Sequence, residues 1–232
     1  MLTALSMSAC YFANSRILKS IQSSFTYCYS DKYTGIDTLI SINGYYREMF
    51  LIKRSPTVGG FLKDTSIYHV DTTYHHFMFY DNGIYVYSIQ GNYYDNREKK
   101  WVIRDVTSFL NDLSENSETL GAKHFYGNYW GGYIICGDTI KVQSMYQAMS
   151  FLDGWHLRED WYKVIDKNTI LCINSFNLPT TEISQPVRRK QYSITFVPIP
   201  AKPKSDESWI LKEKWFWCNE EDWKKHKEQM KK

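Results

Sequence analysis

The sequence predicts an all-β protein: an antiparallel up-and-down meander that closes into a barrel, with a short inserted helix and a C-terminal helical tail. Three observations support this prediction. Aromatic residues make up 17% of the 232 residues, including 19 Tyr and 8 Trp, and such side chains favour a pleated, half-buried surface. Three segments each place two apolar runs around a short turn, which is typical of hairpins. Roughly eight to ten strand-like runs follow one another with short connections, as in a single large β domain.

The first strand and the first hairpin lie in the N-terminal half. Residues 36–53 read IDTLISINGYYREMFLIK, with apolar positions that alternate around Gly44. Residues 75–90 read HHFMFYDNGIYVYSIQ, in which two aromatic and β-branched runs flank Asp81-Asn82-Gly83. Asn-Gly between such runs is the strongest short-range hairpin signal.

Two looser hairpins and two further strands follow. The segment YIICGDTIKVQ (133–143) has a turn at Gly137-Asp138, and WYKVIDKNTILCI (161–173) has a turn at residues 166–168. The run QYSITFVPIP (191–200) predicts a strand that ends at Pro198 and Pro200, which cannot donate to a ladder and suit a sheet edge or a strand end. The run KEKWFWC (212–218) predicts the last strand.

Other segments interrupt the strand pattern. In VIRDVTSFLNDL (102–113) the apolar residues follow the i, i+4, i+7 spacing of an amphipathic helix. The segments 114–121 and 174–190 are interpreted as loops. Residues 219–232 begin with acidic residues and end with lysines, as the helix dipole favours, and predict a charged helical tail with Trp223 packed down.

The N-terminus predicts a lipid anchor. Met-Ser-Ala-Cys at residues 7–10 resembles the lipobox of bacterial lipoproteins, in which the cysteine, here Cys10, is lipidated and becomes the first mature residue. The basic region that a signal requires is missing, so we expect it upstream of Met1. The alternative is a short apolar turn with an ordinary buried cysteine. Residues 11–34 are interpreted as a tether or a short helix.

These interpretations give a domain organisation and a localisation. The expected location is the bacterial cell envelope, with the protein lipid-anchored and attached to the outer membrane. No segment reaches the length of about 18 apolar residues that a membrane helix needs. The predicted parts are a remnant of a lipoprotein signal peptide (1–10), a tether (11–34), the barrel domain (35–218) and the helical tail (219–232).

Four cysteines besides Cys10 permit disulfides in such a compartment. They are Cys28, Cys136, Cys172 and Cys218. Cys136 and Cys172 lie in strand-like runs, where an unpaired cysteine behaves as a small buried apolar residue. The sequence therefore predicts at most one disulfide and leaves its pairing open.

Several functional classes lack support in the sequence. A formal charge of +3 is too small to indicate a nucleic-acid partner, and no Gly-x-Ser-x-Gly, P-loop or Rossmann motif occurs. The nearest approach to a metal site combines His69, Asp71, His75 and His76. Adjacent strand residues point to opposite faces, so His75 and His76 do not easily share one ion, and a bend expected at Thr72-Thr73 separates His69 and Asp71 from His75. The pair Glu159-Asp160 is interpreted as part of a solvated turn. The sequence thus indicates no catalytic residue, no metal site and no cofactor.

With these elements in place, the chain resembles the lipocalin-like (calycin-type) lipoproteins of Gram-negative bacteria. The resemblance spans about residues 36–218 and rests on strand rhythm and turn placement. The segments that carry it are Asn43-Gly44-Tyr45-Tyr46, FYDNGIYV, Trp130-Gly131-Gly132-Tyr133, WYKVIDKNTI and Trp215-Phe216-Trp217. The resemblance implies an up-and-down barrel, commonly with an interior cavity, on a lipid-tethered scaffold.

Aromatic residues in neighbouring predicted strands are the candidate ligand-binding residues. Barrel interiors lined by aromatic rings with a few polar groups suit apolar or planar ligands. The alternative is that these side chains fill a small barrel core. The candidates are Tyr126, Tyr129, Trp130, Tyr133, Trp155, Trp161 and Tyr162.

The leading hypothesis is therefore a non-enzymatic, envelope-anchored binding protein, whose barrel holds a small apolar or aromatic ligand or docks a protein partner. The first alternative is a structural or interaction lipoprotein that contacts another envelope component through an aromatic or basic surface. The basic candidate is the run 183–205, which carries five Lys or Arg residues and no acidic residue; a solvated loop is its other interpretation. The second alternative is an enzyme of unknown reaction with a carboxylate–His site.

Overall fold

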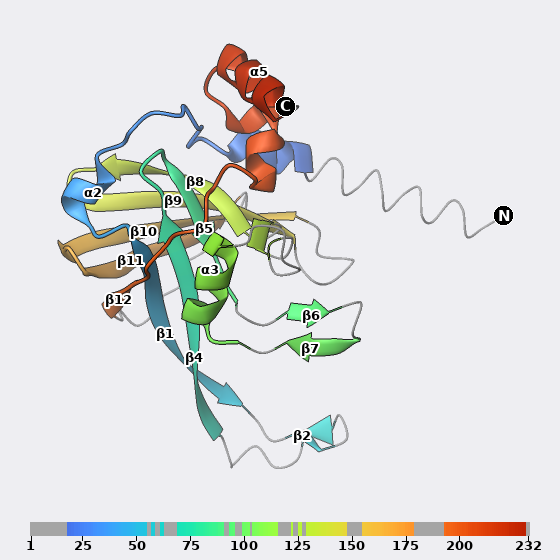
Figure 1. The fold of residues 1–232 in the computed structure, drawn as a ribbon. Coiled ribbons are helices and arrows are strands. Elements are labelled where there is room, and N and C mark those ends of the chain that lie inside the picture. Colours follow the sequence, from blue (N-terminus) through green and yellow to red (C-terminus); the bar gives the residue numbers. More distant parts are fainter. Residues whose placement is uncertain are drawn as a thin grey trace.

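The computed structural model describes most of the chain and confirms the predicted fold class. The described residues are 18–54, 57–58, 61–62, 69–90, 93–95, 99–102, 104–115, 122, 125–126, 129–147, 155–178 and 193–230. The proposed anchor at Cys10 and residues 179–190 of the predicted loop 174–190, with the basic residues among them, lie outside this part of the chain. Residues 174–178 were wrongly assigned to that loop, because they belong to the strand Thr169–Leu178. Eight strands form a closed antiparallel barrel in the order β1-β12-β11-β10-β9-β8-β5-β4 (Figure 1).

Most barrel strands are neighbours both in sequence and in space. The barrel strands are β1 (Gly44–Arg54), β4 (His69–Phe79), β5 (Ile84–Tyr87), β8 (Tyr129–Cys136), β9 (Thr139–Gln147), β10 (Trp155–Asp166), β11 (Thr169–Leu178) and β12 (Ser193–Pro198). The three predicted hairpins are β4–β5, β8–β9 and β10–β11. Pairing of β1 with β12 closes the barrel, which is compatible with the lipocalin-like fold that the resemblance implies.

Two insertions interrupt the meander. Between β1 and β4 lie β2 (Thr57–Val58) and β3 (Phe61–Leu62), which pair with each other. Between β5 and β8 lie β6 (Tyr93–Asp95), β7 (Lys100–Val102) and the helix α3 (Val106–Glu115). The predicted helix is thus confirmed. It begins a few residues later than expected, and it buries Phe109, Leu110 and Leu113 on one side.

One end of the barrel is closed by a short helix that the sequence prediction missed. Residues 36–53 were expected to form a strand, but Ile36–Leu39 form α2 and β1 starts at Gly44. Ile36 and Ile40 are fully buried among the residues that fill the barrel. The amine of Lys202 also lies at this end, where it donates to the carbonyl oxygens of Ile42 and Phe79. Burial lowers the pKa of Lys202 to about 7.

Part of the predicted tether belongs to the fold. Residues 18–24 are helical, and Ile21, Phe25 and Tyr29 are buried in a second apolar core on the outside of the barrel. Gly132 on β8 permits this packing, because a Cβ atom there would stand 2.4 Å from the carbonyl oxygen of Tyr27. Residues 18–34 therefore run along the outside of the barrel and pack against its wall, instead of leading away from it.

The C-terminal segment also differs from its prediction. Residues 212–218 are not a strand: two 3-10 helices, η1 (Trp209–Lys212) and η2 (Lys214–Phe216), occupy this region. Phe216 and Trp217 are buried in the outer core. The predicted helical tail is present as α5 (Glu220–Gln229), whose Trp223 packs against the outer core.

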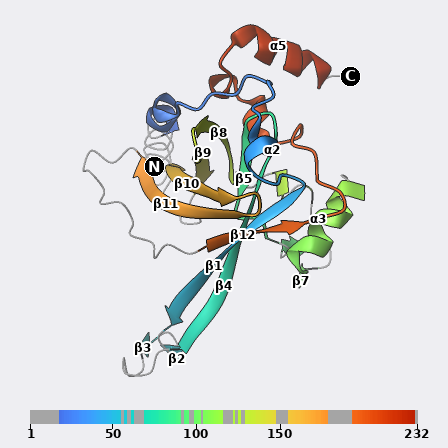
Figure 2. The same cartoon turned by 90° about the vertical axis from the view of Figure 1, so that its left-hand side faces the viewer.

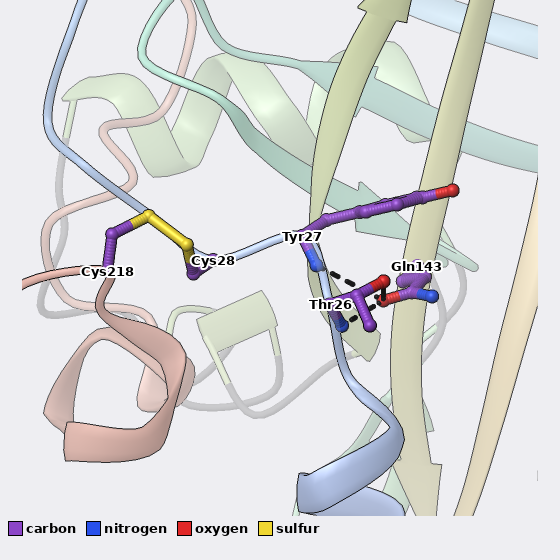
Figure 3. Close-up of a disulfide and its surroundings, with 5 residues drawn as sticks. All are labelled: Thr26, Tyr27, Cys28, Gln143 and Cys218. Atoms are coloured by element: carbon purple, nitrogen blue, oxygen red, sulfur yellow. Dashed lines mark hydrogen bonds between the residues drawn. A yellow bond between two sulfur atoms is a disulfide. The ribbon is translucent and has the colours of Figure 1, made fainter.

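A disulfide joins these two terminal segments. Cys28 and Cys218 are bonded across a sequence separation of 190 residues. Beside them, the backbone N–H groups of Thr26 and Tyr27 donate to Oε1 of Gln143 on β9, at 2.7 and 3.3 Å (Figure 3). Among the described cysteines, Cys136 and Cys172 form no disulfide; Cys172 is buried as the sequence predicts, whereas Cys136 is exposed. The sequence predicted at most one disulfide, which agrees with the single bond between Cys28 and Cys218 among the described residues. The sequence had left the pairing open.

Candidate functional site

The half of the barrel nearest α2 is filled with aromatic side chains. Five interior aromatic residues from four strands are each at most 1% exposed: Tyr46, Phe77, Phe79, Tyr85 and Tyr162. Their rings contact one another, with Phe77 and Tyr162 stacked at 5.3 Å between ring centres. The hydroxyl groups of Tyr85 and Tyr162 lie 3.3 Å apart, and burial raises the pKa of both. This half therefore leaves no room for the interior cavity that the resemblance implies.

Polar and charged side chains replace the aromatic ones farther from α2. Along β10 the inward positions alternate, so that Arg158 and Asp160 follow Tyr162 on the inner face. On β1, Glu48 is paired with His75 of β4 and is only 2% exposed. We call this group, which includes Glu48, His75, Tyr87, Arg158 and Asp160, the polar layer. Ser144 and Ser175 pair with Arg158 and Asp160 from the neighbouring strands, and both serines are buried.

Arg158 is the centre of the polar layer. Its side chain is 13% exposed and that of Asp160 is 2% exposed, and their charged atoms lie 2.8 Å apart. The guanidinium also lies 5.0 Å from the ring centre of Tyr87, and Nη1 donates to the Tyr87 hydroxyl at 3.4 Å. That hydroxyl in turn contacts Nδ1 of His75. The remaining nitrogen of Arg158, Nη2, is buried and has no hydrogen-bond partner among the described residues.

The acidic pair that the sequence placed in a solvated turn was assigned wrongly. Asp160 is 1% exposed inside the barrel. Glu159 points to the outer wall, where its carboxylate accepts from the hydroxyl of Tyr27, the indole N–H of Trp161 and the side-chain amide of Gln143. These adjacent strand residues thus act on opposite faces of the wall. Asp160 forms an ion pair with Arg158 on the inside, and Glu159 accepts a hydrogen bond from the N-terminal segment on the outside.

The structure divides the seven predicted ligand-binding residues between the two sides of the barrel wall. Tyr133 and Tyr162 are buried inside the barrel, and Tyr129 lies beside them, opposite Tyr87. The other four are outside. Tyr126 and Trp130 are stacked in the outer core, Trp155 packs against Trp209, and Trp161 lies beneath the amine of Lys141. The seven residues therefore do not form one site.

β4 runs through Thr72 and Thr73 without the expected bend, and His75 and His76 point to opposite faces, as strand alternation predicts. His75 contacts Tyr87 inside the barrel, whereas His76 packs against Tyr45 in the outer core. Nδ1 of His76 lies 3.3 Å from the carbonyl oxygen of Ile89, so this nitrogen carries the proton. Burial is the main cause that lowers the pKa of His76 to about 4, and Arg47 contributes. The described residues include no group of three His, Cys, Asp or Glu side chains that could hold a metal ion.

His76 makes stability sensitive to acid. Its pKa is about 4 in the folded chain and about 6.5 in an unfolded one. Between these values the unfolded chain binds more protons, so stability falls as the pH drops through this window. We expect a loss of about 1–3 kcal/mol between pH 7 and pH 4, measured by urea unfolding. His76→Gln should remove this component and His226→Gln should keep it; equal curves for wild type and His76→Gln would contradict the assignment.

Comparison with protein-family models, with curated proteins and with solved structures found no match for this chain. In the part of the chain that the structure describes, no helix is long and apolar enough to cross a membrane. A closed barrel with buried aromatic clusters inside and outside its wall is compatible with a binding protein.

Proposed function

We propose that this chain is a binding protein whose barrel holds a small ligand at the polar layer, with an oxygen atom of the ligand bound to Nη2 of Arg158. The observation that carries the proposal is the unpartnered nitrogen itself. Asp160 and Tyr87 engage the rest of the guanidinium, but Nη2 is buried, and no residue that the structure describes accepts from it. Buried donors in folded proteins are almost always paired, and leaving one unpaired costs about 1–3 kcal/mol. A bound oxygen acceptor would remove this cost.

The surroundings of Arg158 define the rest of the ligand. Tyr87 and Tyr129 are paired across neighbouring strands, so their side chains project to the same inner face at the same level of the barrel. They offer an apolar surface to an aliphatic or aromatic body. Because the half nearest α2 is filled, the ligand would lie on the side of the polar layer away from α2. The proposed ligand is thus a small, mainly apolar molecule that carries a carboxylate or carbonyl oxygen.

Replacing Arg158 tests this proposal directly. We expect the wild type to bind 2-naphthoate, measured by the change in probe fluorescence, and Arg158→Met to bind it at least about tenfold more weakly. Lys141→Met is the matched control, because Lys141 is a cation that also lies over an aromatic ring, but on the outer wall. Naphthalene, which has no oxygen, should bind wild type and Arg158→Met equally. Equal binding of 2-naphthoate by wild type and Arg158→Met would contradict the proposal.

We also propose that the chain is a lipocalin-like lipoprotein anchored in the cell envelope through Cys10. The Met-Ser-Ala-Cys segment supports this proposal. The disulfide between Cys28 and Cys218 supports it too, since structural disulfides persist mainly in oxidising compartments. Metabolic labelling with an alkyne fatty acid in a bacterial host should label the wild type but not Cys10→Ser. Equal labelling of both would show that Cys10 is not the attachment site.

A further inference from the structure

The strands β1 and β4 continue beyond the point where their barrel neighbours stop. β12 pairs with β1 only over Gly44–Arg47, and β5 pairs with β4 only at Met78 and Phe79. The pairing of β1 with β4 runs on to Arg54 and His69. Figure 2 shows the resulting two-stranded ribbon projecting from the barrel toward β2 and β3. Along this ribbon, no described strand pairs with the outer edge of either strand.

The backbone of β4 presents hydrogen-bonding groups at its free edge. The N–H of Tyr80 donates to the carbonyl of Ile84, and the carbonyl of His76 accepts from the N–H of Ile89 at 2.8 Å. Backbone groups on a strand alternate in direction with a period of two residues. The N–H and C=O groups of Tyr74 and Thr72 therefore point the same way, away from β1. No described residue bonds to these groups.

A groove borders this edge of β4. It has a volume of about 630 Å³ and separates β4 from the start of α3, a volume within the range of ligand-binding clefts. The sheet side of the groove includes the outer-face residues Tyr45 and Arg47 of β1 and Tyr74 and His76 of β4, and the other wall includes residues 104–107, with the carboxylate of Asp105. The groove therefore lies over the outer face of β1 and β4, beside the free edge of β4.

Charge indicates what kind of segment fits. The guanidinium of Arg47 lies over the ring of Tyr74, 5.2 Å from its centre, and has no carboxylate partner among the described residues. Two copies of this chain paired through the β4 edge would bring two such cations to the same junction, which is unfavourable. A foreign strand with an acidic residue beside Tyr74 would instead pair with Arg47.

We propose that an extended, acidic segment of a partner protein adds to the free edge of β4 as a further strand, with its outer-face side chains directed toward the groove beside α3. Its backbone bonds to Tyr74 and Thr72, and backbone bonds of this kind provide affinity in strand addition. An acidic side chain on the outer face pairs with Arg47 and selects the partner. This interaction surface is separate from the polar layer inside the barrel.

Two designed peptides test the proposal on the full chain. The acidic peptide is acetyl-Thr-Glu-Val-Glu-Val-Glu-Thr-amide, and the basic peptide has Lys in place of each Glu. We expect the acidic peptide to slow hydrogen exchange at the amides of Thr72 and Tyr74 and to bind at least about tenfold more tightly than the basic one. Unchanged exchange at both amides with millimolar acidic peptide would overturn the proposal. Slow exchange there without peptide, with dimers in sedimentation, would overturn it in favour of a second copy.

Variants separate this surface from the rest of the molecule. Thr72→Pro removes an edge donor without removing a bond to β1, so peptide binding should be lost while the unfolding curve stays cooperative. If Thr72→Pro does not fold, Arg47→Glu provides the test, because it should reverse the preference to the basic peptide. Arg158→Met should bind the acidic peptide like wild type, so failure of the ligand proposal and failure of the strand proposal give different results. An unchanged peptide preference in Arg47→Glu would contradict the role of Arg47.

Discussion

Asp160→Ala is expected to destabilise the fold by about 3–5 kcal/mol, because it removes the carboxylate that neutralises a buried guanidinium. The two charged groups lie 2.8 Å apart and are 13% and 2% exposed. Without Asp160, the contacts that Arg158 retains within the described part of the chain are to the hydroxyl and ring of Tyr87. Urea unfolding of the purified variant measures the difference in free energy.

A surface ion pair provides the matched control. Asp138 and Lys163 lie 3.7 Å apart and are 64% and 50% exposed, so Asp138→Ala should cost less than about 1 kcal/mol. The double variant Asp160→Ala/Arg158→Met should recover much of the lost stability, since an apolar pair replaces the unpaired charge. A similarly small cost for Asp160→Ala and Asp138→Ala would mean that the polar layer is hydrated and not buried.

Loss of the disulfide is the second change with a large expected effect. Cys28→Ser/Cys218→Ser should lower stability by about 2–5 kcal/mol, because the bond closes a very long loop and restricts the unfolded chain. The loss should also loosen the pairing of the terminal segments. Here the N–H of Tyr29 donates to the carbonyl of Phe216 at 2.7 Å, and the N–H of Cys218 donates to the carbonyl of Tyr29 at 2.8 Å.

Two comparisons isolate this effect. Cys136→Ser removes an exposed free thiol and should leave stability within about 0.5 kcal/mol of wild type. Wild type in reducing agent should unfold at the same urea concentration as the Cys28→Ser/Cys218→Ser variant. If the double variant is as stable as oxidised wild type, the terminal segments are held by packing alone.

The sequence was most informative where a pattern is local. Asp81-Asn82-Gly83 sits between two β runs, and the turn at these residues follows from the backbone freedom of Asn-Gly. The stripe of Phe109, Leu110 and Leu113 predicted α3 in the same way. The strand prediction for residues 212–218 was wrong because it rested on the aromatic run Trp215-Phe216-Trp217, and aromatic residues favour strands. The burial of this run instead depends on Tyr29 and Phe25, which are far away in the sequence.

The candidate site was less predictable, for a physical reason. In most barrels only one face of the wall is covered by an apolar core, but here both the inner and the outer face are covered. Strand β10 accordingly has Leu157 and Trp161 on the outer face and Tyr162 on the inner face, so hydrophobicity does not show which side is interior. The sequence signal for the polar layer was the spacing of Arg158 and Asp160, which are two residues apart and therefore lie on the same face of β10. Whether that face is the interior depends on how β9 and β11 pair with β10, and the sequence does not show this pairing.

The order of the strands has a consequence for how the chain folds. Strands β8 to β11 pair with their immediate neighbours along the chain, and such contacts form quickly because they close short loops. The pairing of β1 with β12 joins Gly44 to Pro198, so it must wait for most of the chain to collapse. We infer that barrel closure limits the folding rate, as non-local pairing generally does. Oxidation of Cys28 and Cys218 would then follow closure and slow the reopening of the barrel.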